Sequence, residues 1–135
     1  MSAIPAKNRA IVATRSGGVC EGCGLRRATD VHHRQYRSRG GTHAVSNLLA
    51  LCGGAGGLPG GNHTGCHGVA HSGHKGEALG WAIRSNYDPL LVPKFRTFDA
   101  TWWRFDNDGG KEQINPIDAK EYLELIGAIR EGVIQ

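Results

Sequence analysis

Four cysteines have the spacing that most directly suggests a metal site in this sequence. Cys20 and Cys23 form a C-x2-C pair, and Cys52 and Cys66 follow with 13 residues between them. The bend of a C-x2-C turn lets two thiolates face one ion, and four thiolates around Zn²⁺ form a closed tetrahedral site that stabilises a fold. The alternative is a redox-active C-x2-C with two buried thiols. A small core without a redox βαβ pattern favours zinc.

Histidines provide a second set of metal-binding side chains. His67 and His71 are four residues apart, so a helix would carry both imidazoles on one face, where they can share an ion. On the same helix Cys66 would point about 100° away from His67, toward a different ion. One short helix can therefore contribute to two sites. Three further histidines are interpreted as polar loop residues: His43, His63 and His74. Of these, His63 is near enough to Cys66 in the sequence to reach either ion.

The stretch DVHHRQYRSRGG, residues 30–41, places His32 and His33 side by side and continues with Arg34, Arg37 and Arg39. The net charge is +6 over the first forty residues, zero over the next seventy and −2 over the remainder. A basic region is the electrostatic feature of a nucleic-acid-binding protein, and guanidinium groups bind phosphates bidentately. The alternative is an arginine-rich loop that is merely solvated. Neutral imidazole titrates near working pH and suits the proton transfer of phosphodiester hydrolysis.

Length and composition bound the kind of fold. The chain has 135 residues, 39% of them apolar and 21 of them glycine. These values favour one domain with a modest core, stabilised by a metal or by disulfides. The N-terminal sequence is too polar for a secretory signal, and no apolar run approaches 18 residues. We therefore expect a cytoplasmic protein that does not enter membranes.

Two helices are expected at the ends of an α+β fold and one in its middle. Residues 4–18 predict a short helix that ends at Gly17 and Gly18. A second, interrupted by glycines, is expected over residues 66–79. Residues 116–132 predict a helix that ends near Gly132, with one apolar face formed by Ile117, Tyr122, Leu125, Ile126 and Ile129.

Strand composition appears in four segments. Two lie around Val31 and in residues 46–52, and a third covers residues 79–85. The fourth, residues 100–114, contains the turn sequence DNDGG and predicts a β-hairpin. A glycine-rich loop over residues 53–61 has the composition of an insertion within one domain. One or two of three tryptophans in these strands are expected in the core: Trp81, Trp102 and Trp103.

Taken in order, these motifs resemble the HNH endonuclease family. The resemblance runs from Cys20 to His71, through HHR, GG, NLLALCG, GCHG and the last histidine. It is greatest to phage- and prophage-associated members with a four-cysteine zinc site. The resemblance implies a ββα-metal core, two strands and a helix around one metal ion. It further implies a structural zinc on the four cysteines and a catalytic ion on three histidines: His32, His67 and His71.

The resemblance also assigns roles to the neighbours of these ligands. His33 would be the general base that takes a proton from the attacking water, because both adjacent histidines can reach one site where a strand ends and its backbone bends. Asn47 would tie the loop between the strands and so orient His33. DNA phosphates would meet Arg34, Arg37 and Arg39. The whole chain, residues 1–135, would be one nuclease domain, with its core motif in residues 20–75 and a C-terminal extension in residues 76–135.

The resulting hypothesis is a metal-dependent DNA endonuclease that leaves 5′-phosphate and 3′-hydroxyl ends. The resemblance does not distinguish Mg²⁺, Mn²⁺, Ni²⁺ and Zn²⁺ as its catalytic ion. It suggests action in the cytoplasm of a bacterial host or phage-infected cell, beside phage terminase or packaging proteins. With little room for a DNA-reading domain, the chain is expected to nick or cleave with weak specificity.

Two alternatives belong to other functional classes. One is a zinc-stabilised DNA-binding or packaging accessory module without cleavage, although a binder needs neither His33 as a base nor an open metal site. The other is a single zinc finger built from Cys20, Cys23 and two histidines. Only eight residues separate Cys23 from His32, fewer than the usual twelve in such fingers.

Overall fold

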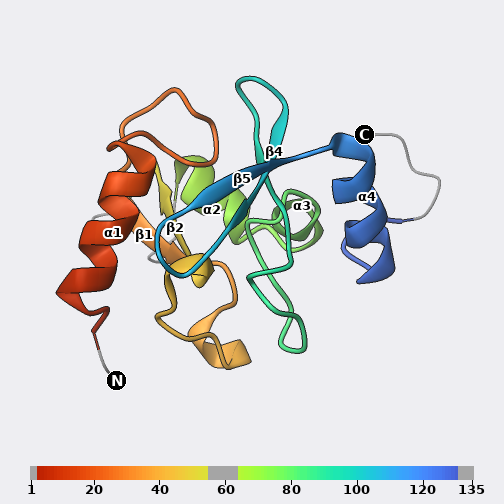
Figure 1. Ribbon diagram of the computed structural model, residues 1–135, viewed down its shortest axis with the longest axis horizontal. Coiled ribbons are helices and arrows are strands. Elements are labelled where there is room, and N and C mark those ends of the chain that lie inside the picture. Colours follow the sequence, from red (N-terminus) through yellow and green to blue (C-terminus); the bar gives the residue numbers. More distant parts are fainter. Residues whose placement is uncertain (1–2, 55–63, 131–135) are drawn as a thin grey trace.

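The computed structural model describes residues 3–54 and 64–130. Within these residues the chain combines helices with two small antiparallel sheets, so the predicted α+β fold class is confirmed. Helix α1 lies at one end of the molecule and helix α4 near the other (Figure 1). In chain order the elements are α1 (Ala6–Ser16), β1 (Asp30–His33), η1 (Arg37–Arg39), η2 (Val45–Asn47), β2 (Leu48–Leu51), α2 (Gly65–Ala70), α3 (His74–Ala78), β3 (Lys94–Arg96), β4 (Thr101–Phe105), β5 (Lys111–Ile114) and α4 (Pro116–Leu125).

Strands β1 and β2 form an antiparallel hairpin that carries the paired histidines. His32 lies opposite Leu49, and His33 lies opposite Leu48. Every residue of β2 is buried, because its alternating side chains enter two separate clusters. Leu48 and Ala50 pack in the cluster that contains Val12 of α1, whereas Leu49 and Leu51 pack in the cluster with Trp81 and two cysteines.

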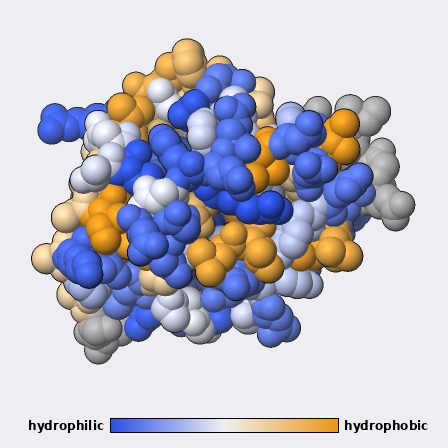
Figure 2. All heavy atoms as spheres, in the orientation of Figure 1, coloured by the Kyte–Doolittle hydropathy of each residue, from blue (hydrophilic) through white to orange (hydrophobic). Residues whose placement is uncertain are grey.

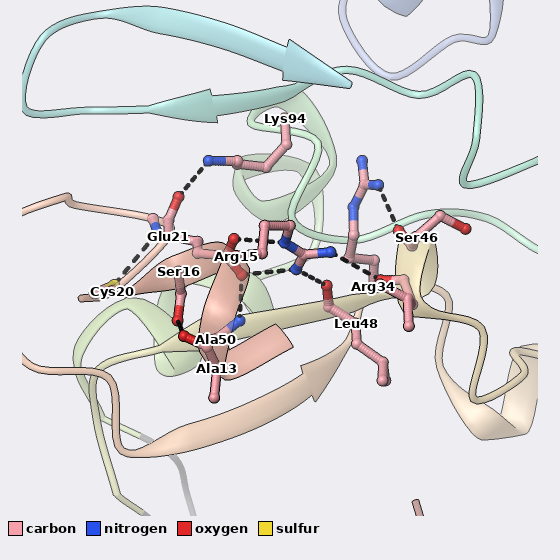
Figure 3. Close-up of polar contacts among 12 residues, drawn as sticks. Ala13, Arg15, Ser16, Cys20, Glu21, Arg34, Ser46, Leu48, Ala50 and Lys94 are labelled. Atoms are coloured by element: carbon pink, nitrogen blue, oxygen red, sulfur yellow. Dashed lines mark hydrogen bonds and ion pairs between the residues drawn. The ribbon is translucent and has the colours of Figure 1, made fainter. Parts of the chain in front are cut away.

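A buried arginine attaches α1 to this hairpin. The Arg15 guanidinium donates two hydrogen bonds of 2.8 Å to the Glu21 carboxylate and one of 2.6 Å to the Leu48 carbonyl (Figure 3). Glu21 also accepts from the Ala50 amide at 2.9 Å, and its own carbonyl accepts from Lys94 Nζ at 2.6 Å. Burial lowers the pKa of Lys94 to about 7. This network connects α1, β2, β3 and the loop between the first two cysteines.

The middle of the chain departs from the sequence prediction. The helix expected over residues 66–79 is divided into α2 and α3, and Gly73 between them has a φ of 60°. The strand expected over residues 79–85 is wrong apart from a single bridge between Ile83 and Gln35. Gly80 turns the chain with a φ of 70°, and a Cβ there would lie 1.9 Å from the Pro93 carbonyl oxygen. Residues 80–83 are all buried, so the apolar composition of this segment indicated burial rather than a strand.

The predicted hairpin over residues 100–114 is confirmed as β4 and β5. Strand β3 pairs with β4 as a third strand that the sequence analysis missed, since three residues are too few for a periodic signal. Trp102 is buried in the cluster formed with α4 and Trp81 in the cluster around the cysteines, while Trp103 is half-buried. The expectation that one or two tryptophans enter the core is therefore confirmed.

Helix α4 is shorter than predicted and packs with a different face. It ends at Leu125, followed by Gly127 with a φ of 76°, whereas the prediction continued it to Gly132. Ile117 and Leu125 are 68% and 80% exposed, so the predicted apolar face was wrong at these two positions. Tertiary contacts instead select the stripe that includes Ala119, Leu123, Ile126 and Ile129. Gly132, most of the glycine-rich loop and His63 lie outside the described residues.

None of the helices that the structure describes is both long and apolar enough to cross a membrane. Polar and charged side chains cover most of the face shown in Figure 2, and its apolar side chains form separate groups.

Candidate active site

The four cysteines meet at the junction of the hairpin and α2. One sulfur from each of Cys20, Cys23, Cys52 and Cys66 lies within 4.8 Å of the others, and none is in a disulfide. Backbone amides point at two of these sulfurs. The amides of Gly22 and Cys23 lie 3.3 and 3.4 Å from Cys20 Sγ, and those of Leu25 and Arg26 lie 3.5 and 3.4 Å from Cys23 Sγ. Amide donors of this kind stabilise thiolates bound to a metal.

Four thiols this close together need a counter-ion before all of them can ionise. A hydrogen bond from Cys66 lowers the pKa of Cys20 to about 4, and the same contact raises the pKa of Cys66. Burial raises the pKa of Cys52. Like charges cannot all form in such a cluster without a counter-ion, and a bound Zn²⁺ supplies one. The donor set, its spacing and its amide contacts therefore fit a structural zinc.

Cys52 and Cys66 are far apart in the sequence, but contacts between residues at the two ends of the segment between them bring these cysteines together. The Thr64 amide and hydroxyl donate to the Gly54 carbonyl at 3.2 and 3.0 Å, and the His67 amide donates to the Cys52 carbonyl at 3.1 Å. A Cβ at Gly53 would lie 2.2 Å from the Thr64 carbonyl oxygen. The chain therefore leaves and re-enters the core at one point, which puts Cys66 beside Cys52.

The structure also gathers His32, His67 and His71. One ring nitrogen of each lies within 4.8 Å of the others, and the three ring centroids are 5.0 to 5.1 Å apart. His32 and His67 are buried, whereas His71 is exposed. The three rings border a cavity of about 270 Å³, whose other lining residues are Val31, His33, Tyr36 and Arg37. Three imidazoles beside an open cavity match the donor set of metal sites that keep a position for substrate or water.

Two contacts orient the rings of this triad. His32 Nε2 lies 2.7 Å from the Trp81 carbonyl oxygen, which can only accept, so the proton of His32 is on Nε2 and its Nδ1 has the lone pair. Burial lowers the pKa of His32 to about 3, which keeps it neutral. His67 Nδ1 lies 2.8 Å from Asp30 Oδ2, which places the proton on Nδ1 and the lone pair on Nε2. Such outer contacts fix the tautomer of a metal-binding histidine and raise its basicity.

Asp30 offers a direct test of this arrangement. We expect Asp30→Asn to weaken divalent-metal affinity at the histidine site about 10- to 100-fold, because the carboxylate no longer supports His67. Isothermal titration calorimetry with Mn²⁺, on protein that retains its cysteine-bound zinc, measures the change. Asp99→Asn, an exposed carboxylate on the loop between β3 and β4, serves as the control. Equal affinity in the Asp30 variant and the wild type would show that Asp30 does not support a metal ligand.

His71 is supported from its other side by Tyr36. The two rings are stacked at 4.8 Å with 16° between their planes, and the Tyr36 hydroxyl donates to the Ala70 carbonyl at 2.8 Å. Burial raises the pKa of Tyr36, so this hydroxyl keeps its proton. The Arg39 guanidinium lies over the Tyr36 ring, 4.5 Å from its centroid, and 3.8 Å from a Glu77 carboxylate oxygen.

His33 lies at the end of β1 and faces the same cavity. Burial, then His43, Arg37 and Arg9, lower its pKa, so the ring is neutral and able to accept a proton at neutral pH. Asn47 is fully buried and binds both ends of the loop after β1. Its Oδ1 accepts from the Gln35 amide at 2.7 Å, and its Nδ2 donates to the Gln35 and Thr42 carbonyls at 3.1 and 2.9 Å.

The three arginines after the paired histidines lie in different environments. Arg34 is fully buried and donates to the carbonyls of Gly80, Ser46, Pro89 and Val92, at 2.6 to 3.2 Å. The prediction that Arg34 binds phosphates is therefore corrected, because its guanidinium holds together segments of the core. Burial lowers the pKa of Arg34 to about 9. Arg37 is exposed and borders the cavity, whereas the Arg39 guanidinium packs on the ring of Tyr36.

Replacing Arg34 is expected to affect mainly the stability of the fold, whereas replacing Arg37 is expected to affect mainly DNA binding. Arg34→Met leaves four buried carbonyls without their donor and should lower the free energy of unfolding by about 3 kcal/mol or more. Arg37 donates one hydrogen bond of 2.6 Å to the Gly41 carbonyl, so Arg37→Ala should lower the free energy of unfolding by only about 1 kcal/mol. The same change should weaken DNA binding and reduce the slope of log K against log salt by about 1. Urea denaturation and fluorescence anisotropy distinguish these effects. A stable Arg34→Met protein that binds DNA weakly would reverse the assignment.

Residues 20–53 match the model of the HNH endonuclease family. The resemblance to this family is thereby confirmed. The match includes the paired histidines, Asn47 and the first three cysteines, and the remaining members of both clusters follow it on α2. The order of β1, β2 and α2 is compatible with the ββα core of HNH proteins. Searches of curated proteins and of solved structures gave no match.

Several residues around the histidine cluster escaped the sequence analysis. Asp30 is two positions from His32 on a strand, and this spacing, which puts both on one face, was the available signal. No sequence pattern predicts the other three contacts, because each joins residues that only the fold brings together. They are made by the Trp81 carbonyl, by the Tyr36 ring, and between His43 and His33.

Proposed function

We propose that this protein is a metal-dependent endonuclease that hydrolyses phosphodiester bonds in DNA. The observation that carries the proposal is the position of His33 at the cavity bordered by His32, His67 and His71. A neutral imidazole next to a metal site with an open coordination position can activate water for attack on a phosphate. The HNH match over residues 20–53 supports the same class of activity.

In the proposed reaction His33 accepts a proton from water as the water oxygen attacks phosphorus. The bond between phosphorus and the 3′-oxygen breaks, which leaves a 5′-phosphate and a 3′-hydroxyl after the leaving oxygen takes a proton from solvent. A divalent cation held by the three histidines would offset the negative charge that gathers on the phosphate and the leaving oxygen. Arg37 borders the same cavity and would contact a neighbouring phosphate, while Asn47 holds the loop after His33 in place.

The wider role that we propose rests on the resemblance to HNH proteins. We treat residues 1–135 as one nuclease domain that acts on DNA in the cytoplasm of a bacterium or of a phage-infected cell, in DNA processing or packaging. The cysteines would hold a structural Zn²⁺. Imidazole ligands bind Zn²⁺, Ni²⁺ and Mn²⁺ more tightly than Mg²⁺, so affinity favours the first three while abundance favours Mg²⁺.

Plasmid cleavage tests the activity and the chemistry of the ends. The protein, washed with EDTA under conditions that retain the cysteine-bound zinc, is incubated with supercoiled plasmid and Mg²⁺, Mn²⁺, Ni²⁺ or Zn²⁺. We expect nicked or linear DNA with at least one ion, and DNA ligase should reseal the nicks because they carry 5′-phosphate and 3′-hydroxyl ends. Nicks that ligase cannot reseal would contradict the proposed chemistry. Binding of DNA without cleavage under every ion would favour the accessory-module alternative.

A further inference from the structure

A second histidine, His43, lies against the His33 ring. His33 Nε2 and His43 Nδ1 are 3.0 Å apart, with 5.2 Å between the ring centroids. His43 comes from the end of the loop between η1 and η2, and the family motif residues considered above leave it unassigned. A nitrogen–nitrogen distance of 3.0 Å means that one proton is shared between these two rings.

The backbone of His43 is held on two sides. Asn8 of α1 donates to the His43 carbonyl at 2.7 Å, and Asn47 donates to the carbonyl of the preceding Thr42 at 2.9 Å. His43 is itself half-buried. Two tethers from separate elements therefore fix this histidine relative to His33, and the one from Asn47 also fixes the start of the loop at Gln35.

The shared proton has two possible positions with opposite consequences. When His33 Nε2 is the donor, His33 Nδ1 has a lone pair and can accept a proton from water. When His43 Nδ1 is the donor, the proton of neutral His33 must be on Nδ1, and that nitrogen is no longer a base. A second group that selects the tautomer of a catalytic histidine is a general requirement of such chemistry.

We propose that His43 is a positioning residue whose Nδ1 accepts a hydrogen bond from His33 Nε2. This contact holds His33 in the tautomer with a basic Nδ1 and fixes its ring toward the cavity. After His33 has taken the proton of the water, its Nε2–H remains hydrogen-bonded to His43. The inference rests on the proposed nuclease function, and it adds a residue that acts through the general base.

Two substitutions at His43 separate hydrogen bonding from packing. Asparagine places a polar atom close to the position of histidine Nδ1, whereas leucine fills a similar volume without a hydrogen bond. We expect His43→Leu to lower kcat about 10-fold or more with a change in KM of about twofold or less. His43→Asn should recover most of the lost kcat. His74→Leu, at an exposed histidine at the start of α3, should behave like wild type.

The same substitutions also overturn the proposal if they give other results. A kcat for His43→Leu within about twofold of wild type would show that His33 needs no partner. Equal losses in His43→Leu and His43→Asn would show that the polar atom near Nδ1 does not restore the contact. A change confined to KM would assign His43 to substrate binding instead.

A spectroscopic measurement tests the tautomer without cleavage. In protein labelled with ¹⁵N at histidine, long-range proton–nitrogen correlation spectra identify the protonated nitrogen of His33. We expect an Nε2–H tautomer in wild type and His43→Asn, and a mixture of tautomers in His43→Leu. An Nδ1–H tautomer in wild type would overturn the inference. If wild type fails to cleave DNA with any ion, the proposed function is lost, and the spectrum alone decides whether His43 orients His33.

Discussion

Replacing His33 by alanine is expected to reduce DNA cleavage about 10²- to 10⁴-fold, which is the contribution of a positioned general base. The imidazole is half-buried at the end of β1, where it borders the cavity rather than a core cluster. Loss of the ring therefore removes the group that accepts the proton of the attacking water but leaves the hairpin and both donor clusters in place. Single-turnover cleavage of a labelled duplex, with the ion that supports wild-type activity, measures the loss.

Folding and DNA binding should be unaffected by the same change. Circular dichroism, zinc content and anisotropy with labelled DNA should match wild type within error, and His74→Ala should cleave at the wild-type rate. Unchanged cleavage by a folded His33→Ala protein would place the base elsewhere. Loss of both cleavage and DNA binding would indicate that His33 serves the structure of the site rather than proton transfer.

Loss of the cysteine-bound metal is expected to unfold the protein. Cys20 and Cys52 are 1% and 4% exposed and pack with Leu49, Leu51 and Trp81, so the metal site is part of the core. Structural Zn²⁺ contributes about 10 kcal/mol or more in small zinc domains at neutral pH. A domain whose free energy of unfolding is about 5 to 15 kcal/mol would therefore keep little or no stability after losing the metal. Cys20→Ala should therefore lose one zinc per chain and its cooperative thermal transition.

Zinc content by inductively coupled plasma mass spectrometry and melting by circular dichroism check this expectation. His71→Ala is the matched control, because it removes a donor of the other cluster from an exposed position. It should retain the cysteine-bound zinc and a cooperative transition near that of wild type. A Cys20→Ala protein with the wild-type melting temperature would show that the cluster does not stabilise the fold through zinc.

Spacing along the chain suggested one pair in each donor cluster, and the HNH resemblance added His32 to the second cluster. C-x2-C is a local turn, and the i,i+4 spacing of His67 and His71 predicts one helical face. In the structure α2 ends at Ala70 and His71 follows it as the helix cap, yet the two rings still meet. The proximity of Cys52 and Cys66 depended instead on glycines that let two parts of the backbone approach closely. A glycine-rich composition permits such an approach but does not require it.

The positions of polar side chains were predicted less well. A run of arginines in a polar stretch is the pattern of a solvated or phosphate-binding loop, but Arg34 turns inward and binds four backbone carbonyls. Those carbonyls come from segments 12 to 58 residues away in the chain. No local pattern encodes such a partner set, because each carbonyl reaches Arg34 only when the remote segments have packed.

By itself, the sequence identified the side chains that could hold a metal and the histidine predicted to move a proton, because ligand types, short spacings and the order of motifs along the chain are local properties. The tertiary structure decided how these groups are oriented and protonated. Asp30 and the Trp81 carbonyl select the nitrogens of His67 and His32, and His43 meets His33 across ten residues of loop. Hydrogen bonds act over about 3 Å, so these choices exist only once the fold has brought their partners together.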